Sequence, residues 1–231
     1  MHIAILMTNT DESDFAQRHP KDGEKFSALL GEVRPVWQFD VFSVKDDEFP
    51  EGDLNLFDGF LITGSPASVR DNEPWIGRLE DLLRELHQRR APMFGACFGH
   101  QVLATALGGV VDDNPGGWVL GTVQTVLTDG EKGKLNLYAA HKEQVTQLPP
   151  NALITATTEG CPIAGFKIGN HIATTQYHPE MTPKFIAALV DELEDTFDPD
   201  VINDARTSLK TEADRLAVAN LIAEFFEIAK G

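Results

Sequence analysis

A cysteine between two glycines is the first group in this sequence with an evident chemical use. In Gly95-Ala-Cys97-Phe-Gly99, the cysteine follows the apolar run 91–94 and precedes a helix-like segment at 100–107. A nucleophile at such a junction sits on a sharp, strained turn, and flanking glycines remove the Cβ clashes that would block the turn. The partial positive charge at a helix N-terminus favours the thiolate form of a thiol. We therefore predict that Cys97 is an exposed nucleophile rather than a buried structural residue.

A thiolate needs a base, and one of the seven histidines has a suitable neighbour. The segment Tyr177-His178-Pro-Glu180 follows a strand-like run from 172 to 177. Positions two apart on a strand project to the same side, and the intervening proline holds the preceding residue extended. We therefore predict that His178 is the general base and that Glu180 orients its ring.

These two motifs together resemble the class I glutamine amidotransferase family, of the type that uses a catalytic triad. The resemblance covers residues 1 to about 190 and rests on the pattern G-x-C-x-G-x-Q followed by Y-H-P-E. It implies that Cys97 is the nucleophile, His178 the base and Glu180 its partner. The same resemblance implies a glutamine or γ-glutamyl compound as substrate and no cofactor.

Further site residues follow from the resemblance. Thr63-Gly64-Ser65-Pro66 comes after the apolar run 59–62 and resembles the oxyanion loop of the family. The backbone amides of Gly64 and Phe98 would then hold the oxyanion. Ser65 and Gln101 are expected near the substrate. His141, near a strand end in a segment resembling guanylate synthetase amidotransferase domains, either borders the substrate pocket or caps a turn.

The elements that must position these residues alternate along the first half of the chain. Strand-like runs at 2–7, 37–44 and 57–63 are separated by a helix-like segment at 22–30, and apolar residues at helical spacing follow from 76 to 86. This order predicts an α/β fold with a mainly parallel open sheet, flavodoxin-like, and helices on both faces. Ligand sites in such sheets lie at the C-terminal ends of the strands, where the candidate residues fall.

The second half is richer in strands. We expect strands at 122–127, 135–139, 153–158, 163–168 and 171–176, with a hairpin turn at Gly169-Asn170, forming an antiparallel extension of the sheet. Helices are expected after Met181 and at 211–230, and the acidic stretch 191–204 is predicted to be an exposed connection. We predict a single domain over 1–231 with a C-terminal helical extension from about 191.

Composition limits the partners. The formal charge of −17 argues against nucleic acid and against anionic membranes. The two cysteines provide no disulfide framework, the N-terminus lacks the features of a signal peptide, and no apolar run has membrane length. A cytoplasmic protein is expected. No metal-ligand spacing or phosphate-binding loop is present in the sequence.

Three functions remain open. The two motifs favour an amidotransferase, which would pass ammonia to a separate synthase subunit. A stand-alone γ-glutamyl peptidase is the alternative. It rests on the lack of a recognisable synthase domain in the sequence and on the stretch Gly116-Gly-Trp118, which resembles plant members of that group. A non-catalytic binding module is the third. A related group of cysteine peptidases places a histidine directly after the cysteine. This chain has Phe98 at that position, which argues against membership of that group.

Three other features are expected to be structural. His100 lies three residues after Cys97 and either competes as base or packs beneath the pocket, which we favour. Cys161 is expected to be a small buried residue. The acidic run Thr10–Asp14 is expected to be a solvated loop, and its place after the first strand also allows it to lie over the site.

Overall fold

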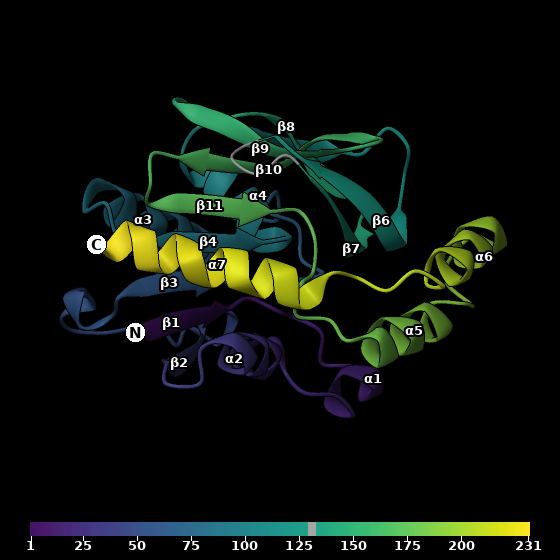
Figure 1. Ribbon diagram of the computed structural model, residues 1–231, viewed down its shortest axis with the longest axis horizontal. Coiled ribbons are helices and arrows are strands. Elements are labelled where there is room, and N and C mark those ends of the chain that lie inside the picture. Colours follow the sequence, from purple (N-terminus) through teal and green to yellow (C-terminus); the bar gives the residue numbers. More distant parts are fainter. Residues whose placement is uncertain (129–132) are drawn as a thin grey trace.

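The computed structural model describes residues 1–128 and 133–231, and a mixed sheet of nine strands forms its centre (Figure 1). The strand order is β2-β1-β3-β4-β11-β10-β9-β6-β7. Neighbours from β2 to β11 pair in parallel, and those from β11 to β7 pair antiparallel. The predicted α/β fold, with a mainly parallel sheet and an antiparallel extension, is confirmed. The strands of this sheet are β1 His2–Met7, β2 Gln38–Ser43, β3 Gly59–Ile62, β4 Met93–Ala96, β6 Val119–Leu127, β7 Lys134–His141, β9 Ala152–Thr158, β10 Cys161–Ile168 and β11 Ile172–Thr175.

Helices cover both faces of the parallel strands. Helices α2 (Asp22–Val33) and α7 (Arg215–Lys230) lie on the face towards the viewer in Figure 1, and α3 (Pro74–Gln88) and α4 (Phe98–Ala106) lie on the other. Strand β1 shows why both faces need a cover. Its Ile5 packs with α2 and α7, whereas its Leu6 packs with α3 and α4. Alternating side chains of a strand point to opposite faces, so an uninterrupted apolar run fits a sheet covered on both sides.

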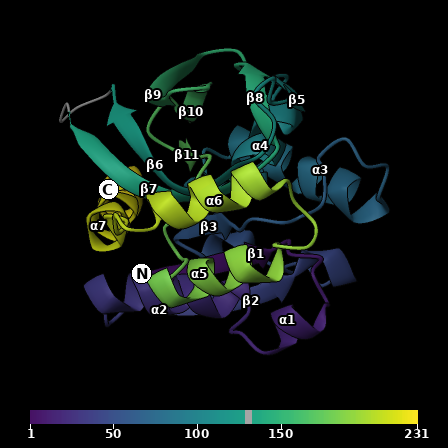
Figure 2. The ribbon, with the colours of Figure 1, turned by 90° about the vertical axis from the view of Figure 1, so that its right-hand side faces the viewer.

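Two further helices lie across the C-terminal ends of the strands (Figure 2). They are α5 (Pro183–Glu192) and α6 (Pro199–Ser208), which share a third apolar cluster with β6 and β7. The prediction of an exposed connection over 191–204 was therefore partly wrong. Asp200 and Asp204 of α6 are exposed, while Ile202 and Ala205 of the same helix are buried. Asp198 caps the helix and Pro199 begins it, which is a helix-start signal that the acidic composition hid.

Other elements differ from expectation in detail. A second sheet of two strands, β5 (Val110–Asp113) and β8 (Glu143–Gln147), was not predicted. The hairpin at Gly169-Asn170 is confirmed, but β11 then runs parallel to β4, so this strand belongs to both parts of the sheet. Short helices are α1 (Asp14–Gln17) and the 3₁₀ turns η1 (Val44–Asp46) and η2 (Leu54–Leu56).

In the part of the chain that the structure describes, none of the helices combines the length and apolar character needed to span a bilayer.

Candidate active site

Cys97 occupies the sharp turn between β4 and α4. Its backbone has a positive φ of 51° with a ψ of −106°, a conformation that side chains other than glycine rarely adopt. The glycines on both sides are required by packing. A Cβ on Gly95 would lie 2.5 Å from the carbonyl carbon of Gly99, and a Cβ on Gly99 would overlap the carbonyl oxygen of Ile62 in β3. The two glycines thus allow α4 to start directly against the backbone of the sheet.

The thiol is covered, so the prediction of an exposed nucleophile was wrong. Cys97 is only 5 % exposed. The segments around Gly64 and His178, at neighbouring strand ends, cover it. They approach closely, since a Cβ built on Gly64 would lie 3.5 Å from the Cys97 Cβ and 2.8 Å from His178 Cε1. The amide Nε2 of Gln176 donates a hydrogen bond to the sulfur at 3.8 Å.

His178 and Glu180 form a buried pair beside this turn. The His178 Nδ1 and Glu180 Oε1 atoms are 2.7 Å apart, and Glu180 is 1 % exposed. Both residues lie beyond the end of β11 at Thr175 rather than on an extended strand. Register explains why they meet Cys97. Strand β11 runs parallel to β4 with Thr175 opposite Ala96. The segments that follow the two strands, one with Cys97 and one with His178, therefore leave the sheet side by side.

Electrostatics favour a charged imidazole at this position. Burial of the ring lowers the pKa of His178, but the negative charges of Cys97 and Glu180 outweigh burial and raise that pKa well above its ordinary value. Its Nε2 atom is buried and has no hydrogen-bond partner in the described part of the chain. A cysteine beside such a ring can attack a carbonyl carbon as a thiolate, and the imidazolium can then protonate the leaving group.

The loop after β3 completes this end of the sheet. Among the described residues, no hydrogen bond is found for the backbone amide of Gly64 or of Phe98. The loop is held by Thr8 at the end of β1, whose hydroxyl donates to the carbonyl oxygens of Thr63 at 3.1 Å and Gly64 at 3.0 Å. Sequence reasoning missed Thr8, although its place at a strand end was a usable signal.

Gln101 and His141 share one buried acceptor. Gln101 Nε2 donates to the carbonyl oxygen of Glu143 at 2.8 Å, and His141 Nδ1 donates to the same oxygen at 3.0 Å. Burial lowers the pKa of His141 to about 4, so its ring is neutral at pH 7. Gln101 also donates to Gln176 at 3.2 Å, and Gln176 donates in turn to Cys97. Gln176 therefore links Gln101 to the sulfur, and His141 joins this hydrogen-bond network through the Glu143 carbonyl oxygen that it shares with Gln101. Gln176 was not predicted as a site residue.

The expected structural residues behave as such. His100 is fully buried, its Nδ1 lies 2.8 Å from the Thr174 hydroxyl, and burial lowers its pKa to about 3. Complete burial and the contact with Thr174 fit the favoured expectation that this ring packs beneath the site. Cys161 is buried, and burial raises its thiol pKa to about 11.

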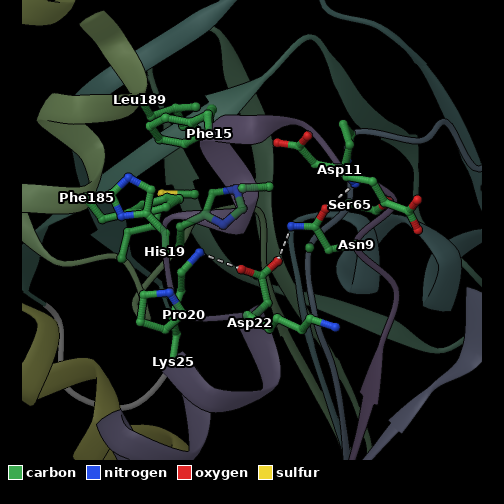
Figure 3. A pocket seen from close by; sticks show the side chains of 18 of the residues that line it. Asn9, Asp11, Phe15, His19, Pro20, Asp22, Lys25, Ser65, Phe185 and Leu189 are labelled. Atoms are coloured by element: carbon green, nitrogen blue, oxygen red, sulfur yellow. Dashed lines mark hydrogen bonds and ion pairs between the residues drawn. The ribbon is translucent and has the colours of Figure 1, made fainter. Parts of the chain in front are cut away.

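A cavity of about 660 Å³ opens beside His178 (Figure 3). Gly64, Ser65 and His178 form one end of it, and α1 and α5 provide much of the remaining wall. The acidic run Thr10–Asp14 satisfies both of its expected roles: most of it is exposed, and Asp11 and Glu12 line the cavity. Gln101 and His141 do not line this cavity, whereas Ser65 does.

Among the described residues, no group of three or more His, Cys, Asp or Glu side chains is placed to hold a metal ion.

Comparison with known proteins adds a second line of evidence. The family model for class-I glutamine amidotransferases matches residues 33–188. Gamma-glutamyl peptidase 3 of Arabidopsis thaliana is 29% identical, with 97% of this chain and 96% of that protein covered. A putative glutamine amidotransferase of Saccharomyces cerevisiae is 34% identical over 77% of this chain and 78% of its own length. The crystal structure of a glutamine amidotransferase from Methylobacillus flagellatus has the same fold, with a TM-score of 0.75 at 22% identity and coverage of 99% and 92%.

Proposed function

The chain belongs to the class-I glutamine amidotransferase family and is an amide-hydrolysing enzyme, and we propose that it cleaves a γ-glutamyl amide through Cys97, His178 and Glu180. The observation that carries this proposal is the buried His178–Glu180 pair, 2.7 Å apart, at the parallel strand end beside the strained Cys97 turn. Charge that is buried this deeply is costly unless it is paired, and such sites are more often functional than structural.

The reaction proceeds in two halves. The Cys97 thiolate attacks the γ-carbonyl carbon, and the carbonyl oxygen becomes an oxyanion held by the amides of Gly64 and Phe98. Each such donor contributes roughly 3–4 kcal/mol in comparable sites. The His178 imidazolium gives its proton to the amide nitrogen, the C–N bond breaks, and an amine leaves a glutamyl thioester behind. Water then attacks the thioester with His178 as base, which releases glutamate and restores the thiolate.

Glu180 acts through the His178 ring. Its carboxylate accepts from Nδ1, so the other nitrogen, Nε2, faces the reacting atoms.

The state of the cysteines bears on the compartment. Both cysteines of the chain are free, and free thiols persist in a reducing compartment, so we place the reaction in the cytoplasm.

The identity of the leaving group separates two versions of this function. If ammonia leaves, the protein serves a separate synthase subunit, as its family membership allows. If a larger amine leaves, it is a stand-alone γ-glutamyl peptidase or amidase. The second version is favoured by the cavity beside His178 and by the near full-length match to gamma-glutamyl peptidase 3. A non-catalytic module would have no need of the paired His178 and Glu180.

Glutamate release by the purified protein tests the proposal. We expect release from glutamine and faster release from γ-glutamyl amides of larger amines, with glutathione as the peptide for comparison, measured with a coupled glutamate assay. Release from glutamine alone, increased by a co-purifying synthase, would support the amidotransferase version. No release from any γ-glutamyl amide, with the Cys97 thiol unreactive towards iodoacetamide, would contradict the proposed function.

Glu180→Gln is expected to lower kcat/KM by roughly 10²–10⁴-fold, because it removes the charge that orients and stabilises the imidazolium. The pH profile should change as well. The raised pKa of His178 keeps the imidazolium present below that pKa, and activity is lost as pH rises through it. Without the Glu180 charge this pKa falls, so the alkaline limb should move to lower pH.

The matched control for this change is Glu224→Gln, at an exposed position on α7. We expect wild-type rates and an unchanged alkaline limb for it. Unchanged activity in Glu180→Gln would refute the role of Glu180.

A further inference from the structure

We propose that the amine released by this enzyme carries an aromatic or branched apolar group, which binds in the cavity between α1 and α5, and carries no carboxylate. This inference rests on the proposed hydrolysis of γ-glutamyl amides and specifies their leaving group.

The position of the cavity relative to the catalytic residues identifies which half of the substrate it takes. Of Cys97, His178 and Glu180, the cavity is lined by His178 alone, within the described part of the chain. The group that protonates the leaving amine must lie within hydrogen-bond reach of it. Gly64, which would hold the oxyanion, lines the same end. The cavity therefore lies where the amine departs.

The cavity is much larger than an ammonia molecule. A molecule the size of water occupies about 30 Å³ in the liquid, whereas this cavity measures about 660 Å³. Cavities of this volume fall in the range that binds organic ligands, which is about 300–1,000 Å³.

The wall of the cavity is aromatic on one side. Phe15 from α1 and Phe185 from α5 have ring centroids 5.7 Å apart, and Leu189 from α5 lines the same cavity (Figure 3). Trp118 and Phe197 also line the cavity, with ring centroids 4.7 Å apart, and Trp118 is 43% exposed. An apolar group on the ligand would bury this surface and gain about 25 cal/mol per Å² of apolar area removed from water.

The two lysines Lys25 and Lys45 that line the cavity are already paired with carboxylates of the protein. Lys25 Nζ lies 2.8 Å from Asp22, which also accepts from Asn9 at 2.7 Å (Figure 3). Lys45 Nζ lies 2.7 Å from Glu12. Lys25 is fixed further by the Phe185 ring, whose centroid is 3.5 Å from Nζ.

A peptide as leaving group would bring a carboxylate that needs its own cation. Lys25 and Lys45 are engaged by carboxylates of the protein, as their ion pairs show. Lys21 lines the rim but is exposed, where an ion pair contributes at most about 1 kcal/mol. An uncharged apolar substituent on the amine fits the cavity better than an amino acid.

Two substrates that differ only by a phenyl ring provide the test. We expect kcat/KM for γ-glutamyl-phenethylamide to exceed that for γ-glutamyl-ethylamide by at least about tenfold, which is the discrimination a complementary apolar pocket supplies. γ-Glutamyl-phenylalanine, which adds only a carboxylate to the first substrate, should be cleaved several-fold more slowly. All three are followed by glutamate release.

Variants locate the selectivity in the cavity. Leu189→Asp places a charge on its apolar wall and should reduce the phenethylamide-to-ethylamide ratio towards one. Leu221→Asp is the matched control, since Leu221 is a partly exposed leucine on α7 outside the cavity, and the ratio should not change. If Leu189→Asp fails to fold, Trp118→Ala, at a solvent-exposed position, should still lower the ratio.

The outcomes separate this inference from the function on which it rests. No release from any of the three amides or from glutamine would overturn the proposed function. Release from all of them with a phenethylamide-to-ethylamide ratio near one would leave the function intact and overturn the inference. γ-Glutamyl-phenylalanine cleaved as fast as the phenethylamide would overturn the exclusion of a carboxylate.

Discussion

Replacing Cys97 with alanine is expected to abolish glutamate release from every γ-glutamyl amide, with a loss of at least about 10⁴-fold in kcat. In the proposed mechanism the Cys97 thiolate forms the bond that splits the reaction into two easier steps, and the other cysteine is not suited to replace it. The Cys161 thiol is buried, and burial raises its pKa to about 11, so it remains protonated at neutral pH. The oxyanion donors and the ring remain in the variant, but they have no attacking atom to assist.

Two measurements make this result specific. Cys161→Ala is the matched control, and it should keep the wild-type rate within a few-fold. Intact-protein mass spectrometry after rapid quenching should show a glutamyl adduct in the wild type and in Cys161→Ala but none in Cys97→Ala. Substantial activity in Cys97→Ala, or an adduct on another residue, would show that the nucleophile is wrongly assigned.

Gly99→Ala is expected to destabilise the whole fold by several kcal/mol and to remove most activity even in the folded fraction. Its new Cβ would overlap the carbonyl oxygen of Ile62 and lie 2.9 Å from the carbonyl carbon of that residue. These are backbone atoms of β3, so no side-chain rotation relieves the clash. Helix α4 would have to move away from the sheet, and it would take Cys97 and the Phe98 amide with it.

Gly77→Ala provides the control for this substitution. Gly77 is also in a helix, α3, but no described atom lies within 4 Å of the position that an alanine methyl group would take there, so the methyl group meets open space. Alanine is favoured over glycine in a helix interior by up to about 1 kcal/mol, so this variant should be slightly more stable. Chemical denaturation of both variants checks the pair. Equal stability of Gly99→Ala and wild type would contradict the close packing of α4 on β3.

The parts of the site that were predictable from sequence are those that depend on local order along the chain. The glycines around Cys97 indicate a turn that only glycine neighbours permit, and the structure explains both of them by close backbone contacts. His178 and Glu180 are two residues apart, so their contact needs little knowledge of the fold. The parallel sheet follows from the alternation of apolar strands and amphipathic helices.

The parts that were not predictable depend on which segments become neighbours. The cover over Cys97 comes from the loop at Gly64 and from the segment at His178, each far from it in sequence. Thr8 and Gln176 act through hydrogen bonds to partners more than fifty residues away. Strands β5 and β8 form a separate two-stranded sheet within the described residues. They are short and rich in polar residues, so they lack the long apolar pattern that marks a strand in sequence.

Helix α6 illustrates a different cause. The stretch 191–204 that leads into it is acidic, and such a composition is typical of an exposed connection, but only one side of a surface helix needs to be apolar. Ile202 and Ala205, on one side of the helix, meet a cluster formed by β6, β7 and α5.

The separation of the apolar clusters bears on how this protein can diverge. The strand ends that carry Cys97 and Gly64 rest on the two large clusters of the sheet, whereas α5 and α6 pack with β6 and β7 in a third cluster. Substitutions on the cavity side of α5 therefore lie outside the two clusters that support these strand ends. We expect relatives of this protein to differ in the amines they accept while keeping the same nucleophile turn, because the proposed amine site and the proposed nucleophile rest on different parts of the core.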